Sequence, residues 1–175
     1  MKRLDHAVLG VTGSSSAAGL EELVDLLERH VAHRATVLCT PDAVKFVHDT
    51  AVPFLTNADW QDQPIHTYLA AQADLLVIAP ATANTVAKCA LGLADNLVTA
   101  TFLASPRPAV VVPATNRVMW EAPTTRRHVA DLRARGHHVL EPGPEIAIST
   151  GVLGDGRSRT WRSAVAEIVE RYALH

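Results

Sequence analysis

The run from Pro80 to Thr85, Pro-Ala-Thr-Ala-Asn-Thr, groups several hydrogen-bonding side chains directly after an apolar segment at 74–79. The apolar segment is typical of a buried strand, and the polar run opens an expected helix. Open parallel sheets bind ligands outside the carboxyl ends of their strands. Thr82, Asn84 and Thr85 are therefore predicted to form a polar wall that hydrogen-bonds a heteroaromatic ring. The alternative is that Asn84 is a simple helix cap.

A second group of polar residues follows the first expected strand, where Gly13, Ser14 and Ser15 open the first helix. Backbone N–H groups at a helix N-terminus, together with serine hydroxyls, are suited to bind a phosphate. The glycine spacing is not the G-x-G-x-x-G dinucleotide fingerprint, and no P-loop lysine follows it. A mononucleotide phosphate therefore fits this turn better than a dinucleotide, and a plain serine cap is the alternative.

Polar residues also follow the second and fourth expected strands. Thr40 and Asp42 could each cap a helix or contact a ligand. In the segment 113–120, Asn116 could hold a carboxylate or an amide. Met119 and the tryptophan after it are residue types that more often fill a core.

Two further features could contribute chemistry. His66 can act as an acid or base near neutral pH, although a lone histidine is more often structural. The segment 149–157 contains three glycines and ends in an arginine, which is typical of a mobile lid with an anion-binding end. An ordinary flexible turn is the alternative for this segment.

The elements that must position these residues alternate along the chain. Apolar runs predict strands at 6–11, 35–40, 74–79, 108–113 and 138–140, and helical spacing predicts helices at 17–33, 41–47, 65–71, 83–104 with an interruption near 92–96, 121–135 and 160–172. Near-continuous apolar strands that alternate with helices favour a parallel sheet covered on both faces. We therefore expect a three-layer, doubly wound α/β fold of the Rossmann or flavodoxin type, as a single domain over residues 1–175.

Composition excludes several functional classes. The 175 residues carry a formal net charge of −2, which indicates neither nucleic acid nor an anionic membrane as a partner. Apolar runs are too short to span a bilayer, and the N-terminus does not predict a signal peptide. Cys39 and Cys89 both fall in apolar segments, so we expect buried thiols, no disulfide, no zinc site and a cytoplasmic location.

Taken in order, these motifs resemble the homo-oligomeric flavin-containing cysteine decarboxylases, from Val8 to about Arg157. The run 80–85 resembles that family's Pro-Ala-Ser-Ala-Asn-Thr motif, and 113–120 resembles Pro-x-Met-Asn-x-x-Met-Trp, with Thr115 in place of methionine. The resemblance implies that FMN is bound by Gly13, Ser14, Ser15, Thr40, Asp42, Thr82, Ala83, Asn84, Thr85 and Thr115.

The resemblance also implies a mechanism. The substrate cysteine is oxidised at its Cβ–S bond by the flavin to a thioaldehyde, which accepts the electrons as CO₂ leaves and yields an enethiolate. His66 would act as the acid and base, and Asn116 would hold the carboxylate or a neighbouring amide through neutral hydrogen bonds. The expected substrate contacts are Asn116, Met119, Thr150, Gly151, Gly154, Gly156 and Arg157.

The family has two main branches, which differ after CO₂ leaves. The coenzyme A branch reduces the enethiol with a proton from a cysteine just before the first glycine of the loop, where this chain has Thr150. In that branch a methionine usually follows the loop's arginine, whereas in this chain Ser158 follows Arg157. We therefore predict oxidative decarboxylation of a precursor peptide's C-terminal cysteine to an aminoenethiol.

Three alternatives remain beside that prediction: phosphopantothenoylcysteine decarboxylation with another proton donor, a non-catalytic flavin-binding regulatory relative, and flavin prenyl transfer. The two motifs disfavour prenyl transfer. The resemblance further implies a homo-oligomer, either a trimer or a dodecamer.

Overall fold

The central strands form because short runs of valine, leucine and isoleucine can be buried on both faces of a parallel sheet. β1 (Leu4–Val11) is buried from its third residue onward, and β4 (Leu75–Ala81) and β5 (Val110–Pro113) are buried throughout. In the computed structural model, which describes residues 2–60, 64–146, 153–172 and 174, these strands are flanked by β2 (Ala32–Cys39), β3 (Phe54–Leu55) and β7 (His138–Val139).

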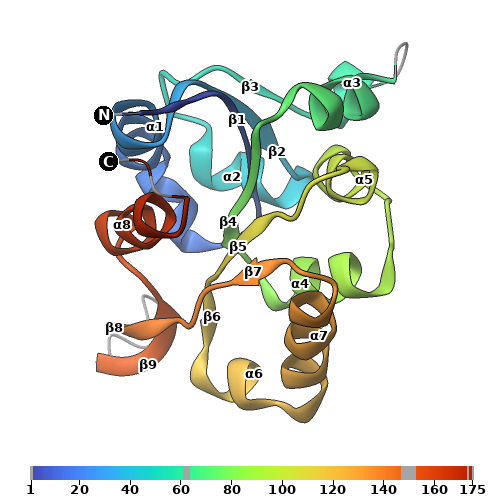
Figure 1. Cartoon of the computed structure of the whole chain (residues 1–175). Helices are drawn as coiled ribbons and strands as arrows, with labels where there is room; N and C mark the ends of the chain where they lie inside the picture. Colours follow the sequence, from blue (N-terminus) through green and yellow to red (C-terminus); the bar gives the residue numbers. More distant parts are fainter. Residues whose placement is uncertain (1, 61–63, 147–152, 173, 175) are drawn as a thin grey trace.

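The sheet has the strand order β3-β2-β1-β4-β5-β7, and all its pairs are parallel. The order reverses between β1 and β4, so the two halves of the sheet diverge there, and this is where open α/β sheets bind ligands. The expected doubly wound α/β fold is confirmed (Figure 1).

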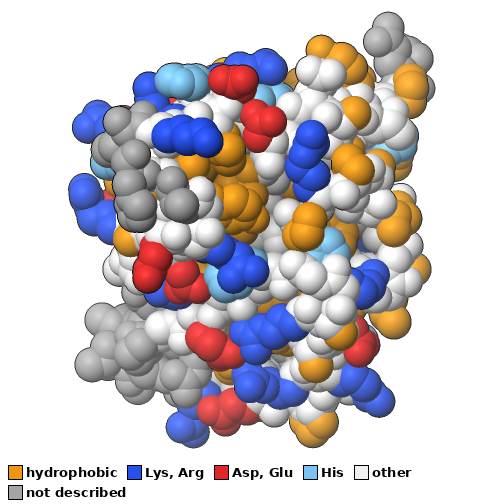
Figure 2. Space-filling model, viewed as in Figure 1, with side chains coloured by type: hydrophobic (Ala, Val, Ile, Leu, Met, Phe, Trp, Pro, Cys, Tyr) orange, Lys and Arg blue, Asp and Glu red, His pale blue; other side chains and the backbone are white. Residues whose placement is uncertain are grey.

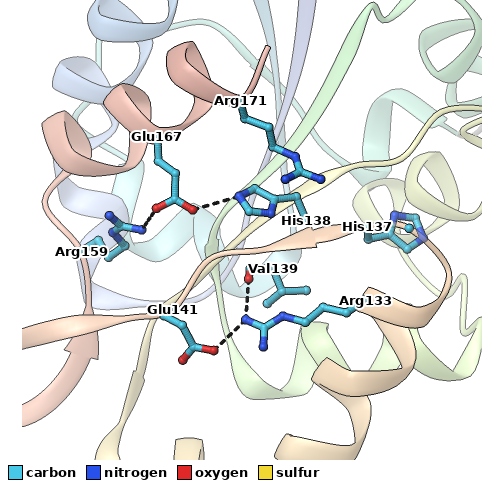
Figure 3. Close-up of a pocket in the computed structure, with 9 residues that line it drawn as sticks. Arg133, His137, His138, Val139, Glu141, Arg159, Glu167 and Arg171 are labelled. Atoms are coloured by element: carbon cyan, nitrogen blue, oxygen red, sulfur yellow. Dashed lines mark hydrogen bonds and ion pairs between the residues drawn. The ribbon is translucent and has the colours of Figure 1, made fainter. Parts of the chain in front are cut away.

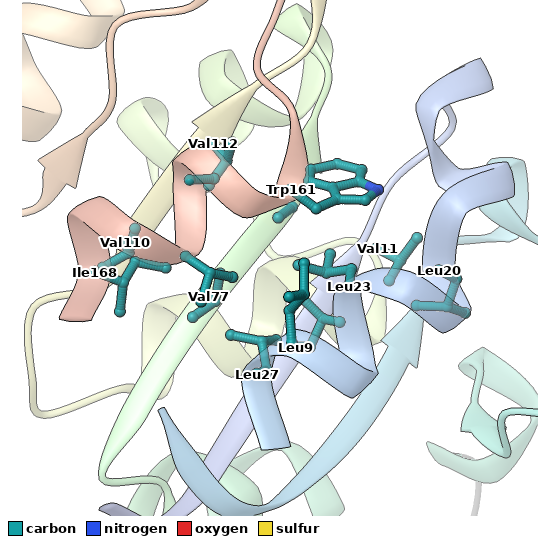
Figure 4. Close-up of a cluster of buried hydrophobic side chains, with 14 of the residues drawn as sticks. Leu9, Val11, Leu20, Leu23, Leu27, Val77, Val110, Val112, Trp161 and Ile168 are labelled. Carbon is teal, nitrogen blue, oxygen red and sulfur yellow. The ribbon is translucent and has the colours of Figure 1, made fainter. Parts of the chain in front are cut away.

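Helices cover both faces of the sheet. On one face, the helices α1 (Leu20–His30), α2 (Pro41–Val47) and α8 (Trp161–Arg171) cover the sheet. They form a core with buried strand residues such as Leu9 and Val77 (Figure 4). On the other face lie α3 (Ile65–Gln72), α4 (Ala83–Leu91), α5 (Leu97–Ala104) and α7 (Pro123–Ala134). No helix in the described ranges is both long and apolar enough to cross a membrane.

The predicted break within 83–104 is confirmed. Gly92 adopts a left-handed conformation with φ of 73° and ends α4, because a residue without a Cβ tolerates this geometry. Asn96 then begins α5 with a capping box, in which its side chain accepts a hydrogen bond from the Thr99 amide and the Thr99 hydroxyl accepts one from the Asn96 amide.

The predicted helix at 17–33 is too long at both ends. Residues Ser15–Gly19 form a 3₁₀ turn, η1, and β2 already begins at Ala32. Gly19 lies against Trp161, where an added Cβ would come within 2.6 Å of the indole nitrogen. The helix predicted at 121–135 is α7, which begins at Pro123, and a separate short helix that was not predicted, α6 (Arg117–Glu121), precedes it.

A second sheet was not predicted. β6 (Thr115–Asn116), β9 (Leu153–Ser158) and β8 (Gly143–Ile146) form an antiparallel sheet in that order. Our expectation of a loop over 149–157 is therefore wrong for residues 153–157, which are a strand, whereas its mobility stays a prediction. The remaining residues of that segment, Thr150 and Gly151 among them, lie outside the described ranges. The glycine-rich sequence of β9 lacks an alternating apolar pattern, so only its pairing partners identify it as a strand.

Candidate functional site

A hollow of about 380 Å³ opens at the carboxyl ends of β1, β2 and β4. The predicted residues Gly13, Thr40, Asp42 and Met119 border it together with three from the motif at 80–85. The residues that line it are Gly13, Thr40, Pro41, Asp42, Thr82, Asn84, Thr85, Lys88, Asp95, Asn96 and Met119. Four stretches that are distant in sequence therefore meet at one site, as the strand-end argument predicted.

The first turn of α4 is built by threonines rather than by the asparagine. The Thr82 hydroxyl accepts a hydrogen bond from the Thr85 amide at 3.3 Å and lies 3.1 Å from the Thr85 hydroxyl. Thr82 is therefore the N-cap, and the suggestion that Asn84 is the cap is wrong. The Asn84 amide is exposed on the first turn and faces the hollow, whereas Ala83 is half-buried as the first residue of the helix.

A buried hydrogen-bond bridge joins β1 to the start of α4. The Thr12 hydroxyl donates to the Pro80 carbonyl at 2.7 Å and accepts from the Thr82 amide at 2.9 Å. The Ala79–Pro80 peptide bond is cis. Sequence reasoning did not assign a role to Thr12, because a threonine after a strand has no local signal for a contact 70 residues away.

The turn after β1 carries the residues predicted to bind phosphate. Gly13 borders the hollow, and an added Cβ at this position would come within 2.6 Å of the Asp42 Cβ. Ser14 caps η1 by accepting a hydrogen bond from the Ser16 amide at 3.3 Å, so the serine-cap interpretation holds for that hydroxyl. Ser15 is the first residue of η1. The absence of a Cβ at Gly13 therefore lets Asp42 pack against this turn at the border of the hollow.

Thr40 has the clearest capacity for a ligand in this hollow. Its side chain is only 6% exposed, and its Oγ1 has no hydrogen-bond partner among the described residues. It occupies the N-cap position of α2 without making a side-chain cap bond. A buried hydroxyl without a partner costs free energy, which a bound polar group would offset. Asp42, by contrast, is exposed and lies 3.5 Å from the Lys45 ammonium.

Four lining residues were missed by sequence reasoning, and one of them is Pro41, the first residue of α2. The Lys88 ammonium and the Asp95 carboxylate form an ion pair at 2.5 Å, and Asn96 adjoins it. The hydrogen bond from Lys88 is the main reason that the pKa of Asp95 lies below its usual value. The break in the helix near 92–96 was visible in the sequence, but its contribution to the site depends on how α4 and α5 pack.

Two of the predicted substrate segments lie side by side. Asn116 and Thr115 in β6 pair with Gly156 and Arg157 in β9, respectively. The Asn116 side chain accepts a hydrogen bond from the Met119 amide at 2.8 Å, which caps α6. Gly154 also lies in β9. Asn116 and the glycine-rich segment thus belong to one small sheet beside the hollow.

Among the described residues, Trp60 makes a directed side-chain contact with His66. The indole N–H of Trp60 donates to His66 Nδ1 at 2.8 Å, and the two rings meet edge to face with centroids 5.1 Å apart. Because an indole nitrogen only donates, a neutral His66 carries its hydrogen on Nε2. His66 does not border the hollow, since α3 packs on α5 on the side away from α6 (Figure 1).

The two cysteines of the chain, both within the described residues, do not contribute a reactive thiol. Cys39 in β2 and Cys89 in α4 are buried, and burial raises the pKa of each to about 12. A thiol with such a pKa is a poor proton donor and is almost never a thiolate at neutral pH.

Comparison with known proteins agrees with this geometry. The chain is 36% identical over 175 residues to the coenzyme A biosynthesis bifunctional protein CoaBC of Mycobacterium tuberculosis; the match covers 96% of this chain but only 40% of that protein. A structure of a cysteine-to-serine mutant of PPC decarboxylase complexed with pantothenoylaminoethenethiol is 28% identical, with a TM-score of 0.88 over 98% of this chain and 100% of that one.

The structure of SpaF, an FMN-dependent cysteine decarboxylase, is 31% identical, with a TM-score of 0.78 over 97% of both chains. The model of the Flavoprotein family matches residues 1–173. With the ligand hollow at the strand ends of a doubly wound sheet, this match means that the chain belongs to the Flavoprotein family.

Proposed function

We propose that the chain is an FMN-dependent decarboxylase of a C-terminal cysteine in a ribosomally made precursor peptide, with an aminoenethiol as the product. The observation that carries this choice is the burial of both thiols. An enzyme that returned the enethiol to a thiol would need a proton donor near the substrate, and neither Cys39 nor Cys89 is a competent acid. Thr150 occupies the position at which the coenzyme A branch has its cysteine.

The hollow fits the flavin. The unpartnered Thr40 hydroxyl can hydrogen-bond a phosphate or ring heteroatom, and Gly13 borders the same hollow. Thr82, Thr85 and Asn84 border the same space. When bound, FMN supplies the two-electron oxidation that makes loss of CO₂ possible.

The remaining steps would fall to protein side chains. The Nε2 of His66 is available to move a proton, because Nδ1 is occupied by Trp60. Asn116 would hold the substrate carboxylate or an adjacent amide through its side-chain NH₂, since its oxygen already accepts from Met119. A neutral amide is suited to this role because a cation would stabilise the carboxylate that must leave.

Phosphopantothenoylcysteine decarboxylation is the second candidate. The similarity to the CoaBC protein and to the structure of PPC decarboxylase favours it as strongly as the similarity to SpaF favours the first. This alternative requires a proton donor other than a thiol of this chain.

A homo-oligomer, either a trimer or a dodecamer, is part of the proposal. His66 lies apart from the hollow of its own chain, so a neighbouring copy is proposed to complete the site. Large apolar side chains on and beside α3, α4 and α5 are unusually exposed and support this assembly, namely Tyr68, Leu91, Leu93 and Leu103. Light scattering of the purified protein would measure its mass, and a monomer would contradict the proposal.

One experiment distinguishes the candidates. The purified protein is tested for a flavin spectrum and then incubated with a peptide that ends in cysteine and, separately, with phosphopantothenoylcysteine. Loss of about 46 mass units from the peptide, equal to CO₂ plus two hydrogens, supports the first candidate. Loss of about 44 mass units from the small substrate alone would support the second and contradict the first. A flavin-bound protein that turns over neither substrate would indicate a regulatory relative.

The catalytic role of His66 is tested by His66→Asn. This variant should keep the flavin spectrum, because His66 does not border the hollow. It should lose turnover, because asparagine cannot take over the proposed proton transfer. Full activity in the variant would show that another residue moves the proton.

A further inference from the structure

Glu167 on α8 connects the edge of the main sheet to the end of β9. One carboxylate oxygen accepts a hydrogen bond from His138 Nε2 at 2.9 Å, and the other accepts one from the guanidinium of Arg159 (Figure 3). Arg159 follows β9 directly, and its second nitrogen donates to the Ser163 hydroxyl at 2.9 Å. Three elements, β7, α8 and the chain after β9, therefore meet at one carboxylate.

These groups are partly shielded from water. Only 18% of the Arg159 side chain and 33% of the Glu167 side chain are exposed, and they border a hollow of about 520 Å³ with Arg133 and Arg171. Charged and histidine side chains gather on this face over α8 and β7 (Figure 2). Screening by water is weaker here than at a free surface, so the pair constrains Arg159 more than an exposed ion pair would.

The ionisation states favour the same contacts. Burial alone would raise the pKa of Glu167, but the hydrogen bond and charge of Arg159 and the contact with His138 lower it overall, so the carboxylate is charged at neutral pH. Burial is also the main reason that the pKa of His138 lies below its usual value, and Arg171 and Arg133 contribute in the same direction. A neutral His138 must carry its hydrogen on Nε2, because a carboxylate only accepts.

Arg159 stands three residues after Gly156, which pairs with Asn116. At about 3.3 Å per residue in an extended chain, Arg159 lies roughly 10 Å along the backbone from the pair of Gly156 and Asn116. Register is weakly specified in glycine-rich strands, and two of the six residues of β9 are glycines. Pairing with β8 holds β9 on its other side, and the way its end is held then contributes to its position against Asn116.

We infer that Glu167 is a positioning residue for substrate binding: by holding Arg159, it places β9 against β6 and so sets Asn116 and Arg157 in register for the substrate. The inference rests on the proposed function of Asn116 and the glycine-rich segment. Glu167 itself contacts neither the hollow that is proposed for FMN nor the residues that border it.

The test uses Glu167→Gln, which keeps the size of the side chain and removes its charge. Hydrogen exchange followed by mass spectrometry should show about tenfold faster exchange of backbone amides in 153–158, as expected for the loss of one charge-assisted contact. With the cysteine substrate that the wild type turns over, the Michaelis constant should rise about five- to tenfold while kcat stays within about twofold. Flavin affinity should not change.

The matched control is Arg162→Gln. Arg162 lies on α8, as Glu167 does, and its Nε is 3.4 Å from the carboxylate of Glu22 on α1, so this variant removes an ion pair away from β9. It should leave both the exchange of 153–158 and the Michaelis constant unchanged. Arg159→Lys keeps the positive charge but loses the forked geometry of the guanidinium, so its exchange in 153–158 and its Michaelis constant should lie between those of the wild type and Glu167→Gln. This second variant keeps the inference testable if Glu167→Gln does not fold.

The outcomes separate this inference from the proposed function. Unchanged exchange in Glu167→Gln would overturn the inference whatever the activity. Faster exchange with an unchanged Michaelis constant would also overturn it, because β9 would then be held without consequence for the substrate. A wild-type protein that turns over neither cysteine substrate would refute the proposed function, and faster exchange in the variant would still support the anchoring of β9.

Discussion

The Thr12 hydroxyl should be a principal determinant of stability at the strand ends. Thr12 is 1% exposed, and its single hydroxyl serves both the Pro80 carbonyl and the Thr82 amide. Thr12→Val preserves the shape of the side chain but removes both hydrogen bonds. The Pro80 carbonyl and the Thr82 amide then stay in place without this partner; the contact with the carbonyl is buried and the contact with the amide is partly buried.

The expected magnitude follows from these two groups. Each buried polar group that loses its partner costs about 1–3 kcal/mol, so the variant should lose about 2–6 kcal/mol of unfolding free energy. For a chain of this size, each kcal/mol corresponds to about 2–4 °C in Tm, which gives a fall of at least about 4 °C. Thr12→Ser keeps the hydroxyl and loses one methyl group, at a cost of about 1 kcal/mol.

Thermal and urea unfolding of the flavin-free protein would measure the two variants beside the wild type. Flavin affinity, followed by fluorescence quenching, should also fall in Thr12→Val, because the Thr82 amide begins the helix that borders the hollow. If Thr12→Val were as stable as Thr12→Ser, the bridge would contribute nothing and the reasoning would be refuted.

Three further predictions concern the turn, the histidine and pH. Gly13→Ala should weaken FMN binding about tenfold or more, since the new Cβ would collide with the backbone and Cβ of Asp42. As a control, the new Cβ in Gly10→Ala would meet only core side chains, so this variant should lower the free energy of unfolding without changing the affinity for FMN. Trp60→Phe should shift the tautomer of His66, measured by ¹⁵N NMR, and lower kcat about tenfold at unchanged flavin affinity; an unchanged tautomer would argue against the assigned contact. Lowering pH from 7 to 5 should destabilise the fold by up to about 1.4 kcal/mol per pH unit for each histidine whose folded pKa lies below 6.5, since the unfolded state then binds more protons. The histidines with a lowered pKa are His6, His137 and His138. Urea unfolding should show this slope, and replacing one of the three by glutamine should reduce it.

Local patterns in the sequence were enough to predict five of the six strands of the main sheet; the two-residue strand β3 was not predicted. Apolar runs such as 74–79 can only be satisfied by burial, and the helices between them leave a parallel arrangement as the consistent solution. The end of α4 was also predictable, because Gly92 and Asn96 act within their own turns. The motif at 80–85 indicated a ligand site for the same reason: a strand end places its next residues at the edge of the sheet.

Contacts between distant residues decided the rest. The Thr12 bridge spans 70 residues to Thr82. The Trp60 contact that orients His66 spans only six residues, but it depends on how two separate short helices are turned toward each other. The strand β9 exists because β6 and β8 are brought beside it, and its own sequence carries no strand pattern.

The sequence by itself therefore determined the fold class, the family resemblance and most residues of the hollow, because local burial and strand ends govern them. Tertiary structure alone decided which hydroxyl lacks a partner, which nitrogen of His66 is free, and how Glu167 is joined to β9. These properties depend on the direction and separation of individual polar atoms, and such geometry is set only when the whole chain has packed.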